Sequence, residues 1–289
     1  MLQVARLSPM LLGEAAELVA DFLRSQLNAD GGFNDRAGAS DLYYTVFGME
    51  GLMALRADLP VQRIADYLAQ VLSIDSLDMI HTCCLARCWA NLPPALRSGA
   101  PVQAIVQRIE SFRSDDGGYN TLARRQHGTL YGCFLAAAGY GDAGVAMPEP
   151  LRMLECIRRL RAGDGGYANQ DELPMGLTPS TAAAVTLLRH LQQPVDASLG
   201  QWLLARCQPE GGFFATPQAP IPDLLSTATA LHALSGMHVE LGPIREPCLD
   251  FIDSLWTNRG SFYGNWSDDT LDTEYTYYGL LALGHLSLR

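Results

Sequence analysis

A two-part motif recurs along the chain and constrains its fold more than any other feature. A turn made of glycines and an aromatic residue is followed by an apolar segment centred on a threonine. The turns are Gly31-Gly32-Phe33, Gly117-Gly118-Tyr119, Gly165-Gly166-Tyr167, Gly211-Gly212-Phe213 and the weaker Gly260-Ser261-Phe262. With one segment that lacks the glycines, the assigned threonines are Thr45, Thr82, Thr129, Thr181, Thr227 and Thr276. Six units at near-regular spacing indicate a helical repeat protein, in which neighbouring units bury one another's apolar faces.

The repeat unit predicts one outer and one inner helix. Amphipathic segments with helical spacing lie at residues 11–27, 61–72, 102–112, 151–160, 197–207 and 248–256, and most begin beside proline or aspartate. We expect the glycines to end these outer helices with a positive φ. The threonine-centred segments, such as residues 132–138 and 182–188, are apolar nearly all round and are predicted to be inner helices. Alternation of the two kinds predicts an all-α α6/α6 toroid, a single domain over residues 1–289.

Composition excludes several classes of function. The chain has 289 residues, a formal net charge of -11 and a pI near 4.9, which disfavour nucleic acid and anionic membrane surfaces. No apolar run is long enough to span a bilayer, and Pro9 interrupts a short apolar N-terminus that does not resemble a signal peptide. The seven cysteines are scattered and odd in number. They predict reduced thiols and a cytoplasmic location.

Residues 31–52 carry the pattern G-G-F-x-D-R-x-G-x-x-D-x-x-x-T-x-F-G-x-x-G-L. It resembles the repeat of protein prenyltransferase β subunits, with the nearest likeness to the geranylgeranyl type that modifies Rab proteins. The wider group includes class II terpene cyclases such as squalene-hopene cyclase, and the likeness extends over nearly the whole chain. The resemblance implies an isoprenoid-handling enzyme that acts on a polyprenyl or polyprenyl diphosphate substrate in a central funnel. A prenyltransferase would also need an α-subunit-like protein partner.

The resemblance places functional side chains four, two and one residues before each repeat threonine. In zinc prenyltransferases these positions supply Asp and Cys from one repeat and His from the next. Here the last two repeats supply Asp223, Leu225 and Tyr275, and no other register completes the set. A complete Asp-Cys-His zinc site is therefore not predicted.

The same positions in repeat six hold Asp272 and Glu274, in the order D-T-E-Y-T. This order is similar to the Asp-x-Asp-Asp motif of class II cyclases, whose middle acid protonates an alkene. If the ring closes, repeat one brings Asp41, Tyr43 and Tyr44 alongside, and we predict Asp272, Glu274, Asp41 and Tyr44 as catalytic residues. Carboxylates this close either bind a divalent cation such as Mg²⁺, or leave one acid protonated, with Glu274 the favoured one.

Substrate-binding and metal-binding residues are predicted around this pair. His127 and the following glycine resemble a His-Gly segment that binds isoprenoid diphosphate, and Arg124 and Arg125 beside it suit a phosphate. Aromatic residues predicted to line the funnel are Tyr43, Phe47, Tyr131 and Tyr277. Candidate metal ligands are Asp41, Asp78 and His81. His81 also shares a helix face with Cys84 and Cys88, for which core packing is the favoured explanation.

Two alternatives compete with an enzyme site. Aspartate at the start of a helix commonly caps it and stabilises it by roughly 1 kcal/mol. Capping explains each aspartate singly, but it does not explain why the polar positions gather in repeats six, one, two and three. The second alternative is a non-catalytic toroid that binds a lipid or a protein segment in its funnel.

Overall fold

The computed structural model describes residues 1–71, 73–171 and 173–288. Its internal contacts divide the chain into two compact units. Unit 1 comprises the described residues of Met1–Ala29, Phe33–Leu59 and Val195–Arg289, and unit 2 comprises those of Asp30–Gly32 and Pro60–Pro194. The extent of the domain predicted from the sequence, 1–289, stays a prediction.

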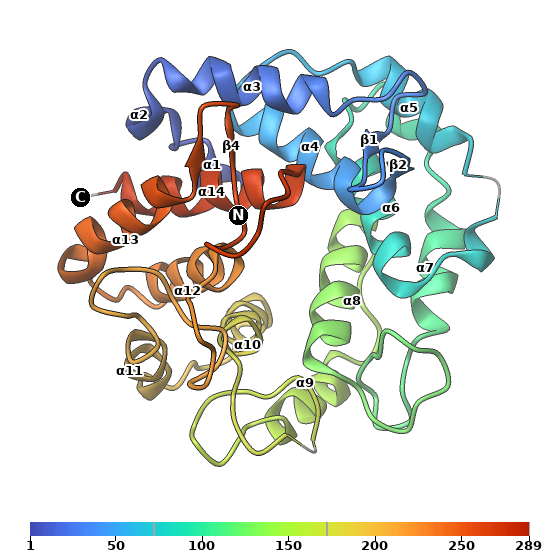
Figure 1. The fold of residues 1–289 in the computed structure, drawn as a ribbon. Coiled ribbons are helices and arrows are strands. Elements are labelled where there is room, and N and C mark those ends of the chain that lie inside the picture. Colours follow the sequence, from blue (N-terminus) through green and yellow to red (C-terminus); the bar gives the residue numbers. More distant parts are fainter. Residues whose placement is uncertain (72, 172, 289) are drawn as a thin grey trace. The chain divides into compact units, whose positions relative to one another are not determined.

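Unit 1 joins the two ends of the chain. Its helices are α1 (Leu2–Ala5), α2 (Pro9–Leu12), α3 (Ala15–Ser25), α4 (Leu42–Ala54), α11 (Ser198–Leu204), α12 (Leu224–Gly236), α13 (Gly242–Ser254) and α14 (Thr273–Leu286). Two antiparallel hairpins accompany them, β1 (Phe33–Asn34) with β2 (Ser40–Asp41) and β3 (Trp256–Thr257) with β4 (Ser261–Phe262). Helix α14 packs against α12, α4 and α1, so the last repeat contacts the first, as the sequence predicts (Figure 1).

Unit 2 holds the middle of the chain. Its helices are α5 (Val61–Ala69), η1 (Ile74–Ser76), α6 (Met79–Asn91), η2 (Arg97–Gly99), α7 (Val102–Glu110), α8 (Leu130–Ala143), α9 (Pro150–Arg159) and α10 (Thr178–His190). Helix α8 packs against α6, α7, α9 and α10. In both units, therefore, an inner helix contacts several neighbouring helices: α14 in unit 1 and α8 in unit 2.

The predicted difference between inner and outer helices is confirmed by burial. Helix α14 buries eleven of its fourteen residues, because its sequence is apolar or small on every side. Helix α5 buries only Ile64, Ala65 and Leu68, which lie on one face at helical spacing. The inner helices thus form the core of each unit, and the outer helices cover it.

The glycine turns have the predicted positive φ, but they do not cap helices. The first glycine of each turn has φ between 82° and 100°. Helix α3 nevertheless ends at Ser25, and Leu27 pairs with Phe33 across a tight turn. Equivalent antiparallel bridges flank the later turns. The glycines therefore close hairpins, and the helices end several residues earlier, with residues in the right-handed region.

The first glycine of a turn also lies against the next outer helix. A Cβ on Gly31 would stand 2.1 Å from the carbonyl oxygen of Arg63 in α5, and one on Gly211 would stand 1.8 Å from that of Pro247 in α13. Gly260 meets Leu18 of α3 in the same way, at 2.1 Å. The turn of repeat six therefore docks on the outer helix of repeat one, which confirms the predicted contact between the chain's ends.

Several predicted helix boundaries differ from the structure. The segment predicted at residues 11–27 is divided between α2 and α3, and α11 ends at Leu204, three residues before the predicted end. Helix α13 begins at Gly242, six residues before the predicted start at residue 248, and it contains Pro247. Pro247 is the sixth residue of this helix, so it removes the N–H that would bond to the carbonyl of Pro243. Helix α5 ends at Ala69, and residue 72, the predicted end, lies outside the described residues.

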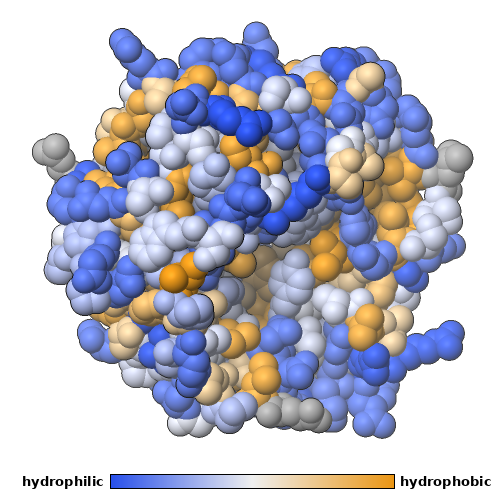
Figure 2. Space-filling view, viewed as in Figure 1, coloured by the Kyte–Doolittle hydropathy of each residue, from blue (hydrophilic) through white to orange (hydrophobic). Residues whose placement is uncertain are grey.

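Polar side chains dominate the face of the molecule drawn in Figure 2. Figure 2 shows hydrophilic side chains over most of the face in view, with hydrophobic ones scattered among them. Within the described part of the chain, no helix combines the length and apolar character needed to cross a bilayer. All seven cysteines are thiols rather than disulfides, as predicted.

Candidate active site

Five of the six inner helices, α4, α6, α10, α12 and α14, begin at the residue after the position four before the repeat threonine. In four repeats this position is an aspartate whose carboxylate accepts backbone N–H bonds at the helix start: Asp41, Asp78, Asp223 and Asp272. The repeat threonine then donates to the carbonyl of that aspartate, as Thr227 does to Asp223 at 2.7 Å. Capping therefore explains the position of each aspartate, and a catalytic role has to rest on further contacts.

The repeat threonine also fixes the glycine turn. Thr45 accepts the buried N–H of Phe33 at 2.9 Å, and Thr227 accepts that of Phe213 at 2.9 Å. In repeat three the N–H of Tyr119 instead approaches the sulfur of Cys133 at 3.4 Å, while Thr129 caps α8. The predicted register of repeat three is therefore wrong by four residues, because the assigned threonine occupies the capping position.

In the corrected register, the three key positions of repeat three are Thr129, Tyr131 and Gly132. Arg124, Arg125 and His127 lie in the exposed loop before α8 and belong to no repeat position. The polar positions gather in repeats six, one and two rather than in four repeats.

Asp272, at the start of α14, is a buried carboxylate in an ion pair with the partly exposed Arg36. Its side chain is 3% exposed, and Arg36 reaches it from the β1–β2 hairpin with Nε at 2.9 Å and Nη2 at 2.8 Å. Burial raises the pKa of Asp272, although hydrogen bonds from the Tyr275 amide and Arg36 oppose this. Arg36 also contacts Asp268 at 3.3 Å and lies over the ring of Tyr275. Arg36 therefore supplies the positive charge that the predicted acidic cluster needs.

Glu274 lies on the first turn of α14, two residues after Asp272, and is half-buried. The hydroxyl of Tyr43 on α4 donates to its Oε1 at 2.6 Å. Burial raises the pKa of Glu274 to about 7, helped by the charge of Asp272 and opposed by Tyr43 and Arg36. At neutral pH this side chain therefore exists in both protonation states, as a general acid requires.

Tyr44 joins the same two helices. Its carbonyl oxygen accepts a bond from the hydroxyl of Thr273 at 2.9 Å. Burial, followed by the charge of Asp272, raises the pKa of its phenol. The structure therefore brings Tyr43, Tyr44, Asp272 and Glu274 together, while Asp41 accepts the amides of Tyr43 and Tyr44 as a cap.

An aromatic cluster adjoins Glu274. The ring of Phe47 lies 4.9 Å from Tyr43, 5.7 Å from Tyr277 and 5.6 Å from Tyr278, measured between centroids. Tyr277 is buried, whereas Tyr43 and Phe47 are half-buried. Tyr131 belongs to unit 2, where it is exposed. The funnel predicted to be lined by all four aromatics stays a prediction.

The predicted phosphate-binding loop has acidic neighbours. His127 is exposed, and its Nδ1 lies 3.8 Å from carboxylate oxygens of Asp116 and Asp171. Burial alone would raise the pKa of Asp116, but hydrogen bonds from Ser114, two backbone amides and Arg159 lower it to about 2. Arg124 and Arg125 are exposed in the same loop. Phosphate binding by these residues stays a prediction.

The predicted metal ligands are distributed over both units. In unit 2, Asp78 accepts the amide of His81 and lies 2.8 Å from its Nδ1. Asp41 belongs to unit 1. Across residues 1–71, 73–171 and 173–288, no three His, Cys, Asp or Glu side chains are grouped to hold a metal ion.

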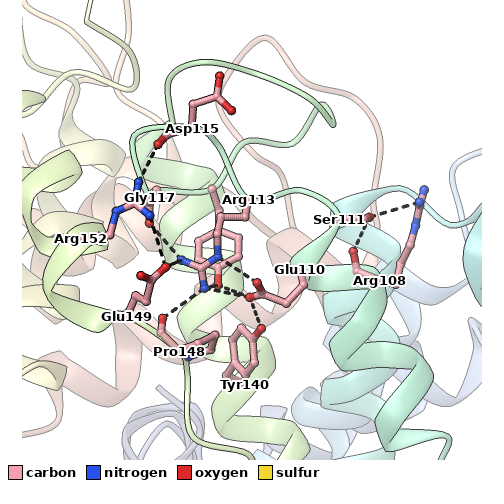
Figure 3. Close-up of polar contacts among 12 residues, drawn as sticks. Arg108, Glu110, Ser111, Arg113, Asp115, Gly117, Tyr140, Pro148, Glu149 and Arg152 are labelled. Carbon is pink, nitrogen blue, oxygen red and sulfur yellow. Dashed lines mark hydrogen bonds and ion pairs between the residues drawn. The ribbon is translucent and has the colours of Figure 1, made fainter.

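One polar cluster was not expected from the sequence. Glu110 at the end of α7 accepts bonds from Arg113 and from the hydroxyls of Tyr119 and Tyr140 (Figure 3). Arg113 also donates to the carbonyl of Pro148. These bonds join α7, the glycine turn of repeat three and α8, so the cluster is structural. Only Tyr119 carried a sequence signal, as the aromatic residue of its turn.

Comparison with known proteins decides the family. A model of the prenyltransferase alpha-alpha toroid domain matches residues 11–84 and 153–287. The chain belongs to this family. The fold class is therefore an all-α α/α toroid, and the resemblance inferred from the repeat is confirmed. A search of curated proteins gives no significant match.

Several solved structures share the toroid fold. A variant of the type II terpene cyclase MstE from Scytonema, in complex with its substrate geranylgeranyl dihydroxybenzoate, has a TM-score of 0.64 and 15% identity, covering 97% of both chains. Candida albicans protein geranylgeranyltransferase-I complexed with GGPP has a TM-score of 0.51 and 16% identity, covering 99% of this chain and 81% of that one. An inactive variant of the α-1,6-mannanase of Salegentibacter has a TM-score of 0.58 and 11% identity, covering 96% and 99%. Such different activities show that the toroid alone does not determine the reaction.

The zinc site of prenyltransferase toroids does not fit this member. At the equivalent positions, Leu225 and Tyr275 replace the thiolate and the imidazole. The ring of Tyr275 packs against Gly264, where an added Cβ would lie 2.5 Å from it. Asp223 accepts bonds from Ser226. One carboxylate without thiolate or imidazole is not a zinc-binding set.

Proposed function

We propose that this toroid is an isoprenoid-handling enzyme of the class II cyclase type, in which Glu274 protonates an alkene of a polyprenyl substrate. The observation that supports this most is the half-buried Glu274, whose pKa is raised to about 7 while Tyr43 holds one of its oxygens. A carboxylic acid that remains protonated near neutral pH can act as a proton donor. Asp272, two residues earlier, plays a different role because Arg36 is bound to it.

The hydrogen bonds give Asp272 and Glu274 different roles. The two contacts of Arg36 favour the ionised form of Asp272, and that negative charge raises the pKa of Glu274. Because Tyr43 donates to Oε1, the transferable proton of Glu274 belongs on Oε2. When the alkene takes this proton, the new carboxylate keeps the bond from Tyr43, which stabilises it.

The aromatic cluster suits the cation that protonation creates. Tyr43 and Phe47 are half-buried, and Tyr278 adjoins them. Aromatic faces attract cations electrostatically and are apolar enough to accept an isoprenoid chain. In this proposal the substrate contacts these rings beside Glu274, and the enzyme acts in the cytoplasm.

Incubation in D₂O tests the proposal. Linear C15 to C30 polyprenols, their diphosphates and geranylgeranyl-substituted aromatic acids are supplied to the full-length protein without added metal. Protonation by an acid that exchanges with solvent predicts a cyclic product isomeric with the substrate that carries one deuterium. Product formation with release of diphosphate would indicate prenyl transfer instead. Binding without conversion of any substrate would favour the non-catalytic toroid, which holds a lipid or a protein segment.

A further inference from the structure

Two cysteines in unit 1 lie close enough to react with each other. Cys207 follows α11 and is half-buried, whereas Cys248 lies on α13 and is fully buried. Their sulfurs are 4.0 Å apart and share a hydrogen bond. A disulfide needs the sulfurs about 2.05 Å apart, so oxidation requires a movement of roughly 2 Å by two small side chains.

The backbone around the two thiols is held by packing. Cys207 pairs with Phe213 across the glycine turn of repeat five. In that turn, Gly211 lies so close to the carbonyl of Pro247 that an added Cβ would stand 1.8 Å from its oxygen. The next residue, Gly212, donates its N–H to the sulfur of Cys248. The turn that carries one thiol is thus docked on the helix that carries the other.

The thiols differ in exposure and charge in a way that suits a reactive pair. The Cys207 thiol and the Gly212 amide donate to Cys248 and hold its pKa below the usual value, although burial opposes this. The hydrogen bond to Cys248 and burial raise the pKa of Cys207, so the negative charge of the pair belongs to Cys248, and the half-buried Cys207 is the protonated and more accessible sulfur. A small oxidant therefore meets Cys207 first, with the thiolate of Cys248 behind it.

We propose that Cys207 and Cys248 form a redox site that a hydroperoxide oxidises to a disulfide. The Cys207 thiol attacks the peroxide and loses its proton to the Cys248 thiolate, the O–O bond breaks, and a sulfenic acid and hydroxide form, with hydrogen peroxide as oxidant. The Cys248 thiol then attacks the sulfenic sulfur and displaces hydroxide, and the Cys248 proton and one proton from solvent convert the two hydroxides to water. Two thiols and one peroxide give one disulfide and two waters. The bond joins the turn of repeat five to the outer helix of repeat six, and it is independent of the proposed cyclase activity.

A second thiol pair in the same chain provides a matched control. In unit 2, the Cys133 thiol raises the pKa of Cys156, and both side chains are fully buried. If proximity alone were sufficient, both pairs would oxidise together. If the exposure of Cys207 matters, only the pair in unit 1 reacts at low peroxide concentration.

Peptide mapping distinguishes these outcomes. The full-length reduced protein is titrated with hydrogen peroxide, alkylated and digested with trypsin without reduction. Cleavage after Arg206, Arg245 and Arg259 places Cys207 and Cys248 on separate peptides of residues 207–245 and 246–259. Cleavage likewise separates Cys133 on residues 126–152 from Cys156 on residues 153–158. The expected result is a cross-link between 207–245 and 246–259, two hydrogen atoms lighter than the sum of the peptides.

Variants and melting temperatures complete the test. Cys207→Ser and Cys248→Ser each abolish the cross-link, and Cys133→Ser leaves it intact. The oxidised wild type should melt several degrees above the reduced protein, because the cross-link restricts the unfolded chain, and Cys207→Ser should show no such shift. Three results would overturn the proposal. Cys207 and Cys248 could both be found alkylated, and therefore still reduced, after peroxide treatment. Cys207 could be oxidised without forming a disulfide, or the pair in unit 2 could react first.

Discussion

The hydroxyl of Tyr43 donates to Oε1 of Glu274 at 2.6 Å, although 231 residues separate them in the chain. Tyr43 lies on the inner helix of repeat one, and Glu274 on that of repeat six. The hydroxyl of Thr273 binds the carbonyl of Tyr44 beside them. The contact between the first and last repeats thus determines the environment of the acid on which the proposed function rests.

Replacing Tyr43 with phenylalanine should raise the pKa of Glu274 further and make it a weaker acid. The bond from Tyr43 stabilises the carboxylate form of Glu274 and opposes the rise of its pKa. In Tyr43→Phe, turnover should fall roughly 10- to 100-fold, because a hydrogen bond to a charged group contributes about 1.5–3 kcal/mol. Since the protonated acid is the active form, the alkaline limb of the pH–rate profile, near pH 7 in the wild type, should move to higher pH. Tyr263→Phe serves as the control, and an unchanged profile in Tyr43→Phe would exclude this role.

Glu274 should also make stability depend on pH. Its pKa is about 7 in the folded state and about 4.5 in the unfolded chain, so the folded state binds the proton more tightly. The stabilisation is fully present below pH 4.5 and is lost as pH rises through 7. Relative to Glu274→Gln, the wild type should therefore lose up to about 3 kcal/mol of unfolding free energy between pH 4.5 and pH 8. Denaturant titrations at both pH values measure this difference. If Glu274 is not protonated in the folded state, the unfolding free energies of the wild type and Glu274→Gln would change equally with pH.

The repeat threonines should contribute to stability through the turn they hold. Thr227→Val removes the acceptor of the Phe213 N–H, which is buried, and should cost about 1–3 kcal/mol. Thr229→Val is the control, because its hydroxyl bonds only to carbonyls within α12, and it should cost less than about 1 kcal/mol. Equal losses in denaturant unfolding would show that the turn does not depend on the threonine.

The glycine that opens a turn should not tolerate a side chain. Gly211 has φ 92° and lies against the carbonyl of Pro247, so Gly211→Ala should destabilise the protein by roughly 2 kcal/mol or more. Gly242→Ala, at the start of α13, meets no atom within 4 Å and should be neutral or slightly stabilising. Melting temperatures of the two variants distinguish the effect of the close contact from the general effect of replacing glycine.

The fold could be predicted because the same turn and helix-start residues recur in each repeat. Glycine at a positive φ, aspartate or threonine at the helix start and a buried hydroxyl on the first turn each leave a sequence signal. The register of repeat three was misassigned because Thr129 caps a helix in the place of aspartate, while Cys133 replaces the threonine. Aligning on the aromatic residue of the turn, Tyr119, would have placed Cys133 in register.

The site was less predictable because its partners are distant in sequence. Asp272 and Glu274 could be selected as an acid pair, and repeat closure suggested Tyr43. The ion pair of Asp272 with Arg36 crosses 236 residues, and although Arg36 stands in the repeat pattern, the pattern does not indicate Asp272 as its partner. Because Arg36 pairs with Asp272, Asp272 is the ion-paired carboxylate and Glu274 is the acid that can be protonated.

The central claim is that Glu274 is the proton donor, and turnover by Glu274→Gln tests it most directly. Glutamine keeps an oxygen that can accept the bond from Tyr43 but has no acidic proton. Turnover of a polyprenyl substrate that the wild type cyclises should fall by about 10²–10⁴-fold, with a melting temperature at pH 6 close to that of the wild type. Cyclisation by Glu274→Gln at the wild-type rate would contradict the account, and a large loss of stability with activity retained would mark the residue as structural.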